Sequence, residues 1–237
     1  MSERRNQYDQ PVGAAVDRWT ERARPPRQAL PGRYCRLEPV DPQRHAADLF
    51  AAYLDAPDAR DWTYLFHERP ETLPLFEEYL AGLARSEDPL HYTIVDTEAA
   101  KPVGTAALMR IDSVHGVIEV GSIAYSPRIR RTRAGTEAMY LLMRLVFEDL
   151  GYRRYEWKCD SLNGPSRAAA LRYGFTFEGI FRRAIVYKGR NRDTAWYSII
   201  AEEWPRIRSA FDAWLDPKNF DARGRQRHDL KAMRPPL

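Results

Sequence analysis

Apolar and polar residues alternate with two different periods between about residue 34 and residue 215, and these periods predict the regular elements. Apolar residues that recur every three or four positions line one face of a helix. They predict helices that begin at Asp41-Pro42 and that cover about 71–84, 135–150, 165–173 and 202–215. Apolar residues at every second position fit strands. They predict strands over about 34–38, 91–96, 101–110, 117–125, 152–159, 176–187 and 194–200.

Helix-boundary residues stand where these patterns change. Asp41 followed by Pro42 fits an N-cap and a first helical position, and Gly151 and Gly174 each follow a predicted helix, where a C′ glycine is common. Residues 117–159 read strand, helix, strand, which implies one parallel strand pair in an otherwise antiparallel sheet. We therefore expect a mixed α/β fold, with a central, mostly antiparallel sheet and helices on both faces.

The two ends of the chain differ from the middle. Residues 1–33 are rich in Arg and Pro and predict an arm without a core of its own, with Trp19 docking on the domain. Residues 34–215 form the expected single domain, and the polar tail 216–237 is expected to be loosely ordered. Trp204 and Trp214 on the last helix are expected to pack on the domain or across a homodimer.

Composition excludes several classes of protein. The 237 residues are 44% hydrophobic, and 37 Lys and Arg against 33 Asp and Glu give a net charge of +4, which fits a phosphate-rich ligand, a nucleic acid or plain solubility. Cys35 and Cys159 are too few for a disulfide framework, and no Cys/His spacing predicts a metal site. No apolar run could span a membrane and no signal peptide is recognisable, so we expect a cytoplasmic protein.

The segment 117–138 carries the strongest chemical signal, because a strand runs through a basic loop into a helix start. Unpaired N–H groups at a helix N-terminus bind phosphate, and Arg130, Arg131 and Arg133 add full positive charges. Ala134 and Gly135 are small and allow an anion to approach the backbone. These features alone leave two interpretations open: a pyrophosphate-binding loop or a solvated basic turn.

The loop 130–135 resembles the acyl-CoA loop Gln/Arg-x-x-Gly-x-Gly/Ala of the GNAT acetyltransferases, with Arg133 in place of the inner glycine. Gly135-Thr136-Glu137-Ala138 resembles the helix start of the RimJ/RimL-like branch. Asn163-Gly164-Pro165-Ser166, followed by Gly174-Phe175 and Glu178-Gly179, resembles the Asn-x-x-Ser…Gly-Phe…Glu-Gly signature of that branch. The resemblance covers about residues 34–200.

This resemblance implies that acetyl-CoA binds where the strand ending at Ile123, Ala124 and Tyr125 splays from its parallel neighbour, 155–159. A backbone N–H near Ile123 or Ala124 would stabilise the oxyanion. The implied contacts to acetyl-CoA also include the loop and two further segments, through Arg130, Arg131, Thr132, Arg133, Ala134, Gly135, Thr136, Asn163, Ser166 and Tyr173.

Two residues are candidates for catalysis. Attack on a thioester needs a neutral amine, and the resemblance implies Glu119 as the base. The alternative is an exposed strand carboxylate paired with an arginine. Ser166 is the implied acid or thiolate-stabilising donor, with an ordinary first-turn serine as the alternative; Asn163 likewise fits a helix N-cap. A glutamate that some relatives carry is replaced here by Ile185.

The acceptor is an amine. Trp62, Tyr64 and Phe66 lie where this superfamily walls the acceptor pocket, although plain core packing also explains them. The resemblance favours the N-terminal α-amine of a protein or peptide over a small amine such as an antibiotic or polyamine. A non-catalytic acyl-CoA-binding module is a further alternative. So is a nucleic-acid binder that uses Arg128–Arg133 with Arg182, Arg183, Arg190 and Arg192, but no helix-turn-helix or stacking platform supports it.

Overall fold

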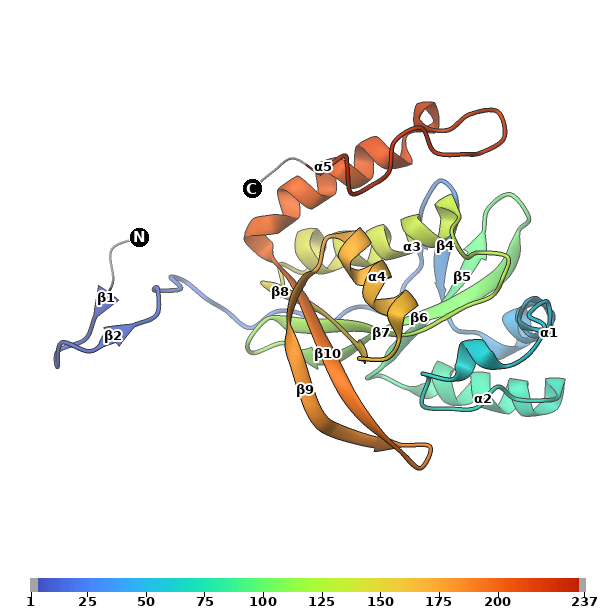
Figure 1. The fold of residues 1–237 in the computed structure, drawn as a ribbon, viewed down its shortest axis with the longest axis horizontal. Coiled ribbons are helices and arrows are strands. Elements are labelled where there is room, and N and C mark those ends of the chain that lie inside the picture. Colours follow the sequence, from blue (N-terminus) through green and yellow to red (C-terminus); the bar gives the residue numbers. More distant parts are fainter. Residues whose placement is uncertain (1–3, 235–237) are drawn as a thin grey trace.

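The computed structural model describes residues 4–234 and places a mixed eight-stranded sheet at the centre of the molecule (Figure 1). The strands are β1 (Arg4–Arg5), β2 (Pro11–Val12), β3 (Leu30–Pro31), β4 (Cys35–Pro39), β5 (Leu90–Asp96), β6 (Lys101–Asp112), β7 (Val117–Tyr125), β8 (Arg154–Asp160), β9 (Thr176–Tyr187) and β10 (Arg190–Ile200). The helices are α1 (Pro42–Leu54), α2 (Leu73–Arg85), α3 (Arg133–Arg144), α4 (Gly164–Tyr173) and α5 (Trp204–Leu215), with short helical turns η1 (Arg60–Trp62), η2 (Leu145–Asp149), η3 (Ala201–Glu203) and η4 (Pro217–Asn219).

The sheet confirms the expected mixed topology. Its strand order is β3-β4-β5-β6-β7-β8-β10-β9, and β7 with β8 is the parallel pair within residues 4–234. Pairing between these two strands ends at Val120 and Trp157. Just beyond, β7 carries a bulge against β6, and Ser122 adopts a left-handed φ of 48°. A bulge bends the strand that carries it, so β7 turns away from β8 and the two strands splay.

Helices cover both faces of the sheet, as predicted (Figure 1). One buried cluster joins the sheet to α3, α4 and α5, where the ring of Tyr173 stacks on that of Phe211 with centroids 6.1 Å apart. A second cluster on the other face joins α1 and α2 to the sheet through Tyr53, Phe76 and Ala124. The splayed ends of β7 and β8 therefore lie between two packed layers.

Local residues explain most helix ends. Oδ1 of Asp41 accepts hydrogen bonds from the N–H groups of Gln43 and Arg44, which confirms the predicted N-cap. Gly174 ends α4 with a φ of 103°. The helix predicted over 135–150 begins two residues earlier, because Oγ1 of Thr132 caps it by accepting from Gly135 N–H. Its last turn widens into the π-helical η2.

The N-terminal arm touches the domain at several places after the projecting β1–β2 hairpin (Figure 1). Nε1 of Trp19 donates to the Val114 carbonyl at 2.8 Å, as its expected docking requires. Further on, Leu30 is buried and β3 pairs with β4. The Trp19 and Leu30 side chains and the β3–β4 pairing together hold the arm on the domain, although the arm has no core of its own.

The C-terminal tail packs on the domain in its described part, although its polar composition predicts loose order. Leu230 is buried, and Trp214 Nε1 donates to Gln226 Oε1 at 2.9 Å. Trp204 and Trp214 are both buried in the core of their own domain. The tail is therefore held by α5, and both tryptophans pack within this chain.

Two classes of feature are missing from the described chain. Between residues 4 and 234, no helix combines the length and the apolar character that a membrane crossing requires. The same residues contain no group of three or more His, Cys, Asp or Glu side chains that could hold a metal ion.

Candidate active site

A cleft of about 2150 Å³ opens where β7 and β8 separate. It is lined by the end of β7, the basic loop, the starts of α3 and α4, and the aromatic segment after α1. Every residue that the sequence suggested for catalysis, acetyl-CoA or the acceptor lines it except Ala134, which is buried in α3. The fold thus brings together residues that lie more than a hundred positions apart, from Trp62 to Tyr173.

The start of α3 has the properties of an anion site. The Gly135 N–H is satisfied by Thr132 Oγ1 and the Thr136 N–H by the Thr132 carbonyl, which leaves the first-turn N–H groups of Arg133 and Ala134 for a ligand. A Cβ on Gly135 would lie 2.7 Å from the Ile129 carbonyl oxygen, so only glycine allows the loop to close this tightly on the helix. These features fit a diphosphate group.

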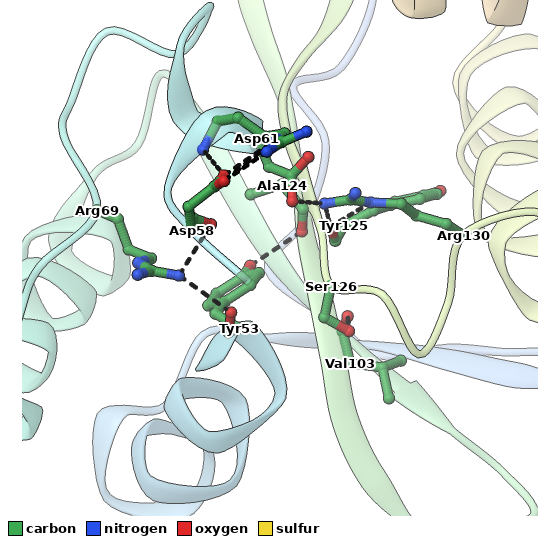
Figure 2. A network of polar contacts seen from close by, with 10 residues as sticks. Tyr53, Asp58, Asp61, Arg69, Val103, Ala124, Tyr125, Ser126 and Arg130 are labelled. Carbon is green, nitrogen blue, oxygen red and sulfur yellow. Dashed lines mark hydrogen bonds and ion pairs between the residues drawn. The ribbon is translucent and has the colours of Figure 1, made fainter. Parts of the chain in front are cut away.

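The loop arginines are not equivalent. Arg130 donates to the Tyr125 carbonyl through Nε at 3.1 Å and Nη2 at 2.9 Å, and it is ion-paired with Asp61 (Figure 2). The guanidinium of Arg133 lies between the rings of Tyr34 and Phe220, at 4.7 and 5.1 Å from their centroids. The replacement of the inner glycine by Arg133 therefore places its charge beside aromatic rings.

Arg131 differs from both neighbours. It is exposed and takes a left-handed φ of 59° at the turn of the loop. A residue in this conformation next to right-handed ones aims successive N–H groups into one concavity, which favours anions. Arg128, further back in the loop, is paired with Asp55 at 2.5 Å. Of these loop arginines, Arg131 thus carries the charge that is free for a phosphate.

The end of β7 is fixed from the α1 side. The hydroxyl of Tyr53 donates to the Ala124 carbonyl at 2.9 Å, and Arg69 holds the carbonyls of Tyr53 and Asp58 (Figure 2). Tyr53 is buried, which raises the pKa of its phenol well above the usual range and keeps it protonated as a donor. This network fixes the strand segment after the bulge.

Glu119 lies on β7 with 4% of its surface exposed. The alternative interpretation is therefore wrong about its exposure, although Glu119 does pair with an arginine, as that interpretation expected. Its Oε2 lies 3.0 Å from Lys158 Nζ and 3.1 Å from Arg110 Nε. Lys158 also pairs with Glu156 at 2.6 Å. Burial raises the pKa of Glu119 above its ordinary value, while Lys158 and Arg110 oppose that change. A buried carboxylate with a raised pKa is a stronger proton acceptor.

The start of α4 faces the same cleft. Asn163 caps the helix by accepting from the Ser166 N–H at 3.1 Å. The Ser166 hydroxyl accepts from Trp157 Nε1 at 3.0 Å, and this bond does not use its own proton. Burial raises the pKa of the neighbouring Cys159 thiol, so it stays neutral and is a poor nucleophile.

Tyr173 lies deep in the cleft wall. Its ring packs against Trp157 and Phe211, and its hydroxyl points to the Gly135 carbonyl at 3.5 Å. Burial raises its pKa, so the phenol remains protonated at neutral pH.

The three aromatic residues proposed for the acceptor side differ in burial and in the contacts that they make. Trp62 is 3% exposed and packs edge-on against Tyr53 with ring centroids 5.4 Å apart, so it serves the core as well as the cleft. Tyr64 donates to the Leu162 carbonyl at 3.2 Å and bridges the cleft to the start of α4. Phe66 is 49% exposed and packs on Tyr187.

Several charged residues of the cleft could not be predicted from the sequence pattern. Lys158 and Arg110 pair with Glu119, and Asp61 pairs with Arg130. Alternation along β8 was the available signal for Lys158, because it predicts that Glu156 and Lys158 share a face. Asp61 and Arg110 follow from tertiary contacts alone.

Comparisons with known proteins agree with this site. Residues 35–176 match the family model described as an acetyltransferase (GNAT) domain. A crystal structure of a GCN5-related N-acetyltransferase from Brucella melitensis is 50% identical, with a TM-score of 0.90 over 92% of this chain and 99% of that one. A structure described as a probable acetyltransferase of the GNAT family, from Chromobacterium violaceum, is 37% identical, with a TM-score of 0.76 over 83% of this chain and 98% of the other.

The chain belongs to the GNAT family and is an acetyltransferase. GNAT acetyltransferases use acetyl-CoA as co-substrate. The RimL ribosomal L7/L12 α-N-protein acetyltransferase is 20% identical over 73% of this chain and 93% of that one, with a TM-score of 0.61, and shares the fold. A comparison with curated protein sequences found no match.

Proposed function

We propose that this acetyltransferase transfers the acetyl group of acetyl-CoA to the N-terminal α-amine of a protein or peptide. The observation that carries the proposal is the size and charge of the cleft. At about 2150 Å³ it is larger than the roughly 300–1,000 Å³ of an ordinary small-molecule pocket, so it has room for a peptide end beside the acetyl donor.

The charges of the cleft argue against a polycationic acceptor. Asp58, Asp61 and Glu119 line it, and each is already paired with a cation of the protein. Asp160, also in the lining, accepts hydrogen bonds from Tyr187 and Leu162, and Glu78 lines the cleft without an ion pair in the described chain. A polyamine or an aminoglycoside antibiotic needs carboxylates that are free to bind ammonium groups. The cleft offers few, so a single α-amine is the better fit.

The bound acetyl-CoA supplies the thioester, and the residues of this chain position and deprotonate the amine. The N–H groups at the start of α3 and the Arg131 side chain bind the diphosphate. The splayed end of β7, at Ile123–Tyr125, pairs with the pantetheine, and a backbone N–H there stabilises the charge on the carbonyl oxygen.

Glu119 accepts a proton from the ammonium form of the acceptor, directly or through water. The neutral amine then forms the C–N bond while the C–S bond breaks. The second proton that the nitrogen loses passes to the departing thiolate to give the free thiol of CoA, and Ser166 donates a hydrogen bond to that sulfur as it leaves. An α-amine has a pKa of about 7.7–8.0, so the proton transfer to a carboxylate is far less uphill than from a lysine at about 10.4. This difference favours an α-amine acceptor.

Thiol release from acetyl-CoA with matched acceptors tests the proposal. We expect turnover with a short peptide that has a free α-amine and none with the same peptide acetylated at its N-terminus. Spermidine and an aminoglycoside form the second arm of the assay. Turnover with these amines but with no peptide would overturn the choice of acceptor.

The variant Glu119→Gln tests the base. It should lose about 10²–10⁴-fold in kcat and still bind acetyl-CoA, because it removes the proton acceptor and leaves the diphosphate site intact. The protein's thermal shift with acetyl-CoA measures that binding; saturating co-substrate stabilises by about 2.7 kcal/mol at a hundredfold excess over Kd. An active Glu119→Gln variant would exclude Glu119 as the base.

A further inference from the structure

Arg192 is a charged side chain of the cleft that the proposed mechanism does not use. It lies on β10, lines the cleft and is 6% exposed. Its Nε has no hydrogen-bond partner, and Arg192 takes part in none of the ion pairs found between residues 4 and 234. Most buried charges in proteins are paired, because an unpaired one loses its hydration without replacement.

The surroundings of Arg192 are aromatic and apolar. Its guanidinium lies 5.3 Å from the ring centroid of Phe66 and 5.8 Å from that of Tyr187. Directly across the strand pair stands Ile185. The nearby carboxylate of Asp160 is engaged elsewhere, since it accepts hydrogen bonds from the Tyr187 hydroxyl at 2.7 Å and the Leu162 N–H at 2.9 Å. The described chain therefore places no carboxylate at ion-pair distance from the Arg192 guanidinium.

The two rings also limit what Arg192 can bind. Aromatic rings that pack against a guanidinium leave its N–H edge as the contact surface. That edge matches a planar carboxylate, which accepts two parallel hydrogen bonds from it. A carboxylate ligand would supply both a paired negative charge and the hydrogen-bond acceptors that the Arg192 guanidinium lacks.

The position of Arg192 relates this contact to the reaction. Arg192, Thr194 and Trp196 share one face of β10 because side chains alternate along a strand. Thr194 Oγ1 and Trp196 Nε1 are likewise buried without a partner. Trp196 is opposite Lys158, whose Nζ lies 3.9 Å from its ring centroid and also pairs with Glu119. The side chains on this face of β10 therefore extend from Arg192 to Trp196, which contacts the lysine that is paired with the proposed base, Glu119.

The length of this face indicates the kind of acceptor. Four residues of a strand span about 13 Å. A carboxylate bound by Arg192 and an amine that reacts beside Glu119 must therefore be separated by several covalent bonds of the acceptor. In a free amino acid, the amine and the α-carboxylate share one carbon. A side-chain carboxylate near a peptide N-terminus reaches the distance more readily.

We propose that Arg192 binds a carboxylate of the acceptor, so that this enzyme prefers peptide or protein N-termini with an acidic side chain among their first few residues. This inference rests on the proposed function and specifies its acceptor. Arg192 acts on the acceptor alone and has no part in binding the diphosphate.

Paired peptides test the inference. One tetrapeptide amide carries Glu at its second position and the other carries Gln, and kcat/KM is measured for both. We expect the wild-type enzyme to prefer the Glu peptide by about tenfold to a hundredfold, mainly through KM. The variant Arg192→Met should lose this preference while keeping its fold, because it removes an unpaired buried charge and retains the packing between the rings.

Arg190→Met is the matched control. Arg190 also contacts the ring of Tyr187, at 5.2 Å, but it is exposed, lies outside the cleft lining and donates to the Thr63 carbonyl. We expect this variant to keep the preference for the Glu peptide. Arg192→Lys should keep part of it, since the charge remains while the bidentate edge is lost.

The outcomes separate this inference from the proposed function. Equal kcat/KM for both peptides, or a preference that survives in Arg192→Met, overturns the role of Arg192 even if acetylation is efficient. Free glutamate and glutamine form another arm, and acetylation of glutamate in preference to the Glu peptide would overturn the peptide acceptor. If acetyl-CoA gives no thermal shift with the wild-type protein, the proposed function itself fails.

Discussion

The Nζ of Lys158 lies 3.0 Å from Oε2 of Glu119, and both side chains are almost fully buried beside the point where β7 and β8 separate. Glu119 stands directly across from Glu156 in the parallel pair, and Lys158 bridges the two carboxylates. Two carboxylates in one buried site repel each other, and Lys158 offsets this repulsion together with Arg110 on Glu119 and Arg154 on Glu156.

We predict that Lys158→Met destabilises the protein by about 1–3 kcal/mol, because two buried carboxylates lose their shared cation and keep one arginine each. The substitution also removes an interaction that lowers the pKa of Glu119, which burial already raises. The acid limb of kcat/KM should therefore move to higher pH. Urea denaturation and a pH–rate profile measure the two effects.

The double variant Lys158→Met/Glu119→Gln is the control for stability. It removes one of the two carboxylates that have lost their shared lysine and should recover part of the lost free energy of unfolding. No recovery would mean that Lys158 stabilises the protein through its contact with Trp196 instead.

We predict that Arg131→Glu weakens acetyl-CoA binding by about tenfold to a hundredfold, because it reverses the exposed charge at the turn of the loop. Arg128→Glu changes the same charge in the same loop, but Arg128 is engaged with Asp55. It should leave binding nearly unchanged. Thermal shifts in titrations with acetyl-CoA compare the two variants, and equal losses would contradict a specific role for Arg131.

Tyr53→Phe should lower stability by about 1–3 kcal/mol, since the Ala124 carbonyl then loses a buried donor. The KM for acetyl-CoA should rise as well, because this hydrogen bond fixes the end of β7. Tyr79→Phe serves as control: the described chain forms no hydrogen bond with that hydroxyl, although Tyr79 lies in the same aromatic cluster. A Tyr53→Phe enzyme with unchanged KM would show that the strand end is fixed by other contacts.

Glu137 gives a prediction about a thiol. Its carboxylate accepts the N–H groups of Arg33, Tyr34 and Cys35 at 2.9, 2.5 and 2.8 Å and so ties α3 to the start of β4. Burial, with Glu137 as a further cause, raises the pKa of the Cys35 thiol well above its ordinary value. In native protein at pH 8, Cys35 should therefore resist a disulfide reagent.

Glu137→Ala should cost at least about 2 kcal/mol and allow Cys35 to react at lower urea concentration. Reaction kinetics in a Cys159→Ser background isolate the one thiol. Glu137→Gln keeps the side-chain shape and one acceptor oxygen. Its stability and its Cys35 reactivity should therefore lie between those of the wild-type protein and Glu137→Ala. Rapid labelling of Cys35 in the native wild-type protein would contradict this account.

Sequence periodicity predicted most of the fold because the helices and strands carry strong patterns and clear boundary residues. The cap at Asp41 and the left-handed Gly174 are local features, and they formed as expected. The bulge at Ser122 could not be predicted in this way, since a serine has no local preference for a positive φ. It follows from pairing with β6 on one side and the loss of pairing with β8 on the other.

The residues of the candidate site also divide into those that local sequence patterns predict and those that depend on contacts between distant parts of the chain. Residues of the basic loop and of α4 were found because they lie close together in short motifs. The charged partners were not, because the Lys158–Glu119 pair depends on the register of two parallel strands. Burial decides the properties of Arg192, and a basic strand residue on its own gives no sign that it lacks a partner.

The aromatic sandwich around Arg133 has a consequence for binding kinetics. It holds the end of the basic loop against Tyr34, just before β4, and Phe220, just after η4, so two separate parts of the chain restrain the loop. The conformational entropy of the loop is then lost during folding and not when acetyl-CoA arrives. Association should be fast, with a small entropic penalty, and loosening either aromatic contact should slow it before the affinity is abolished.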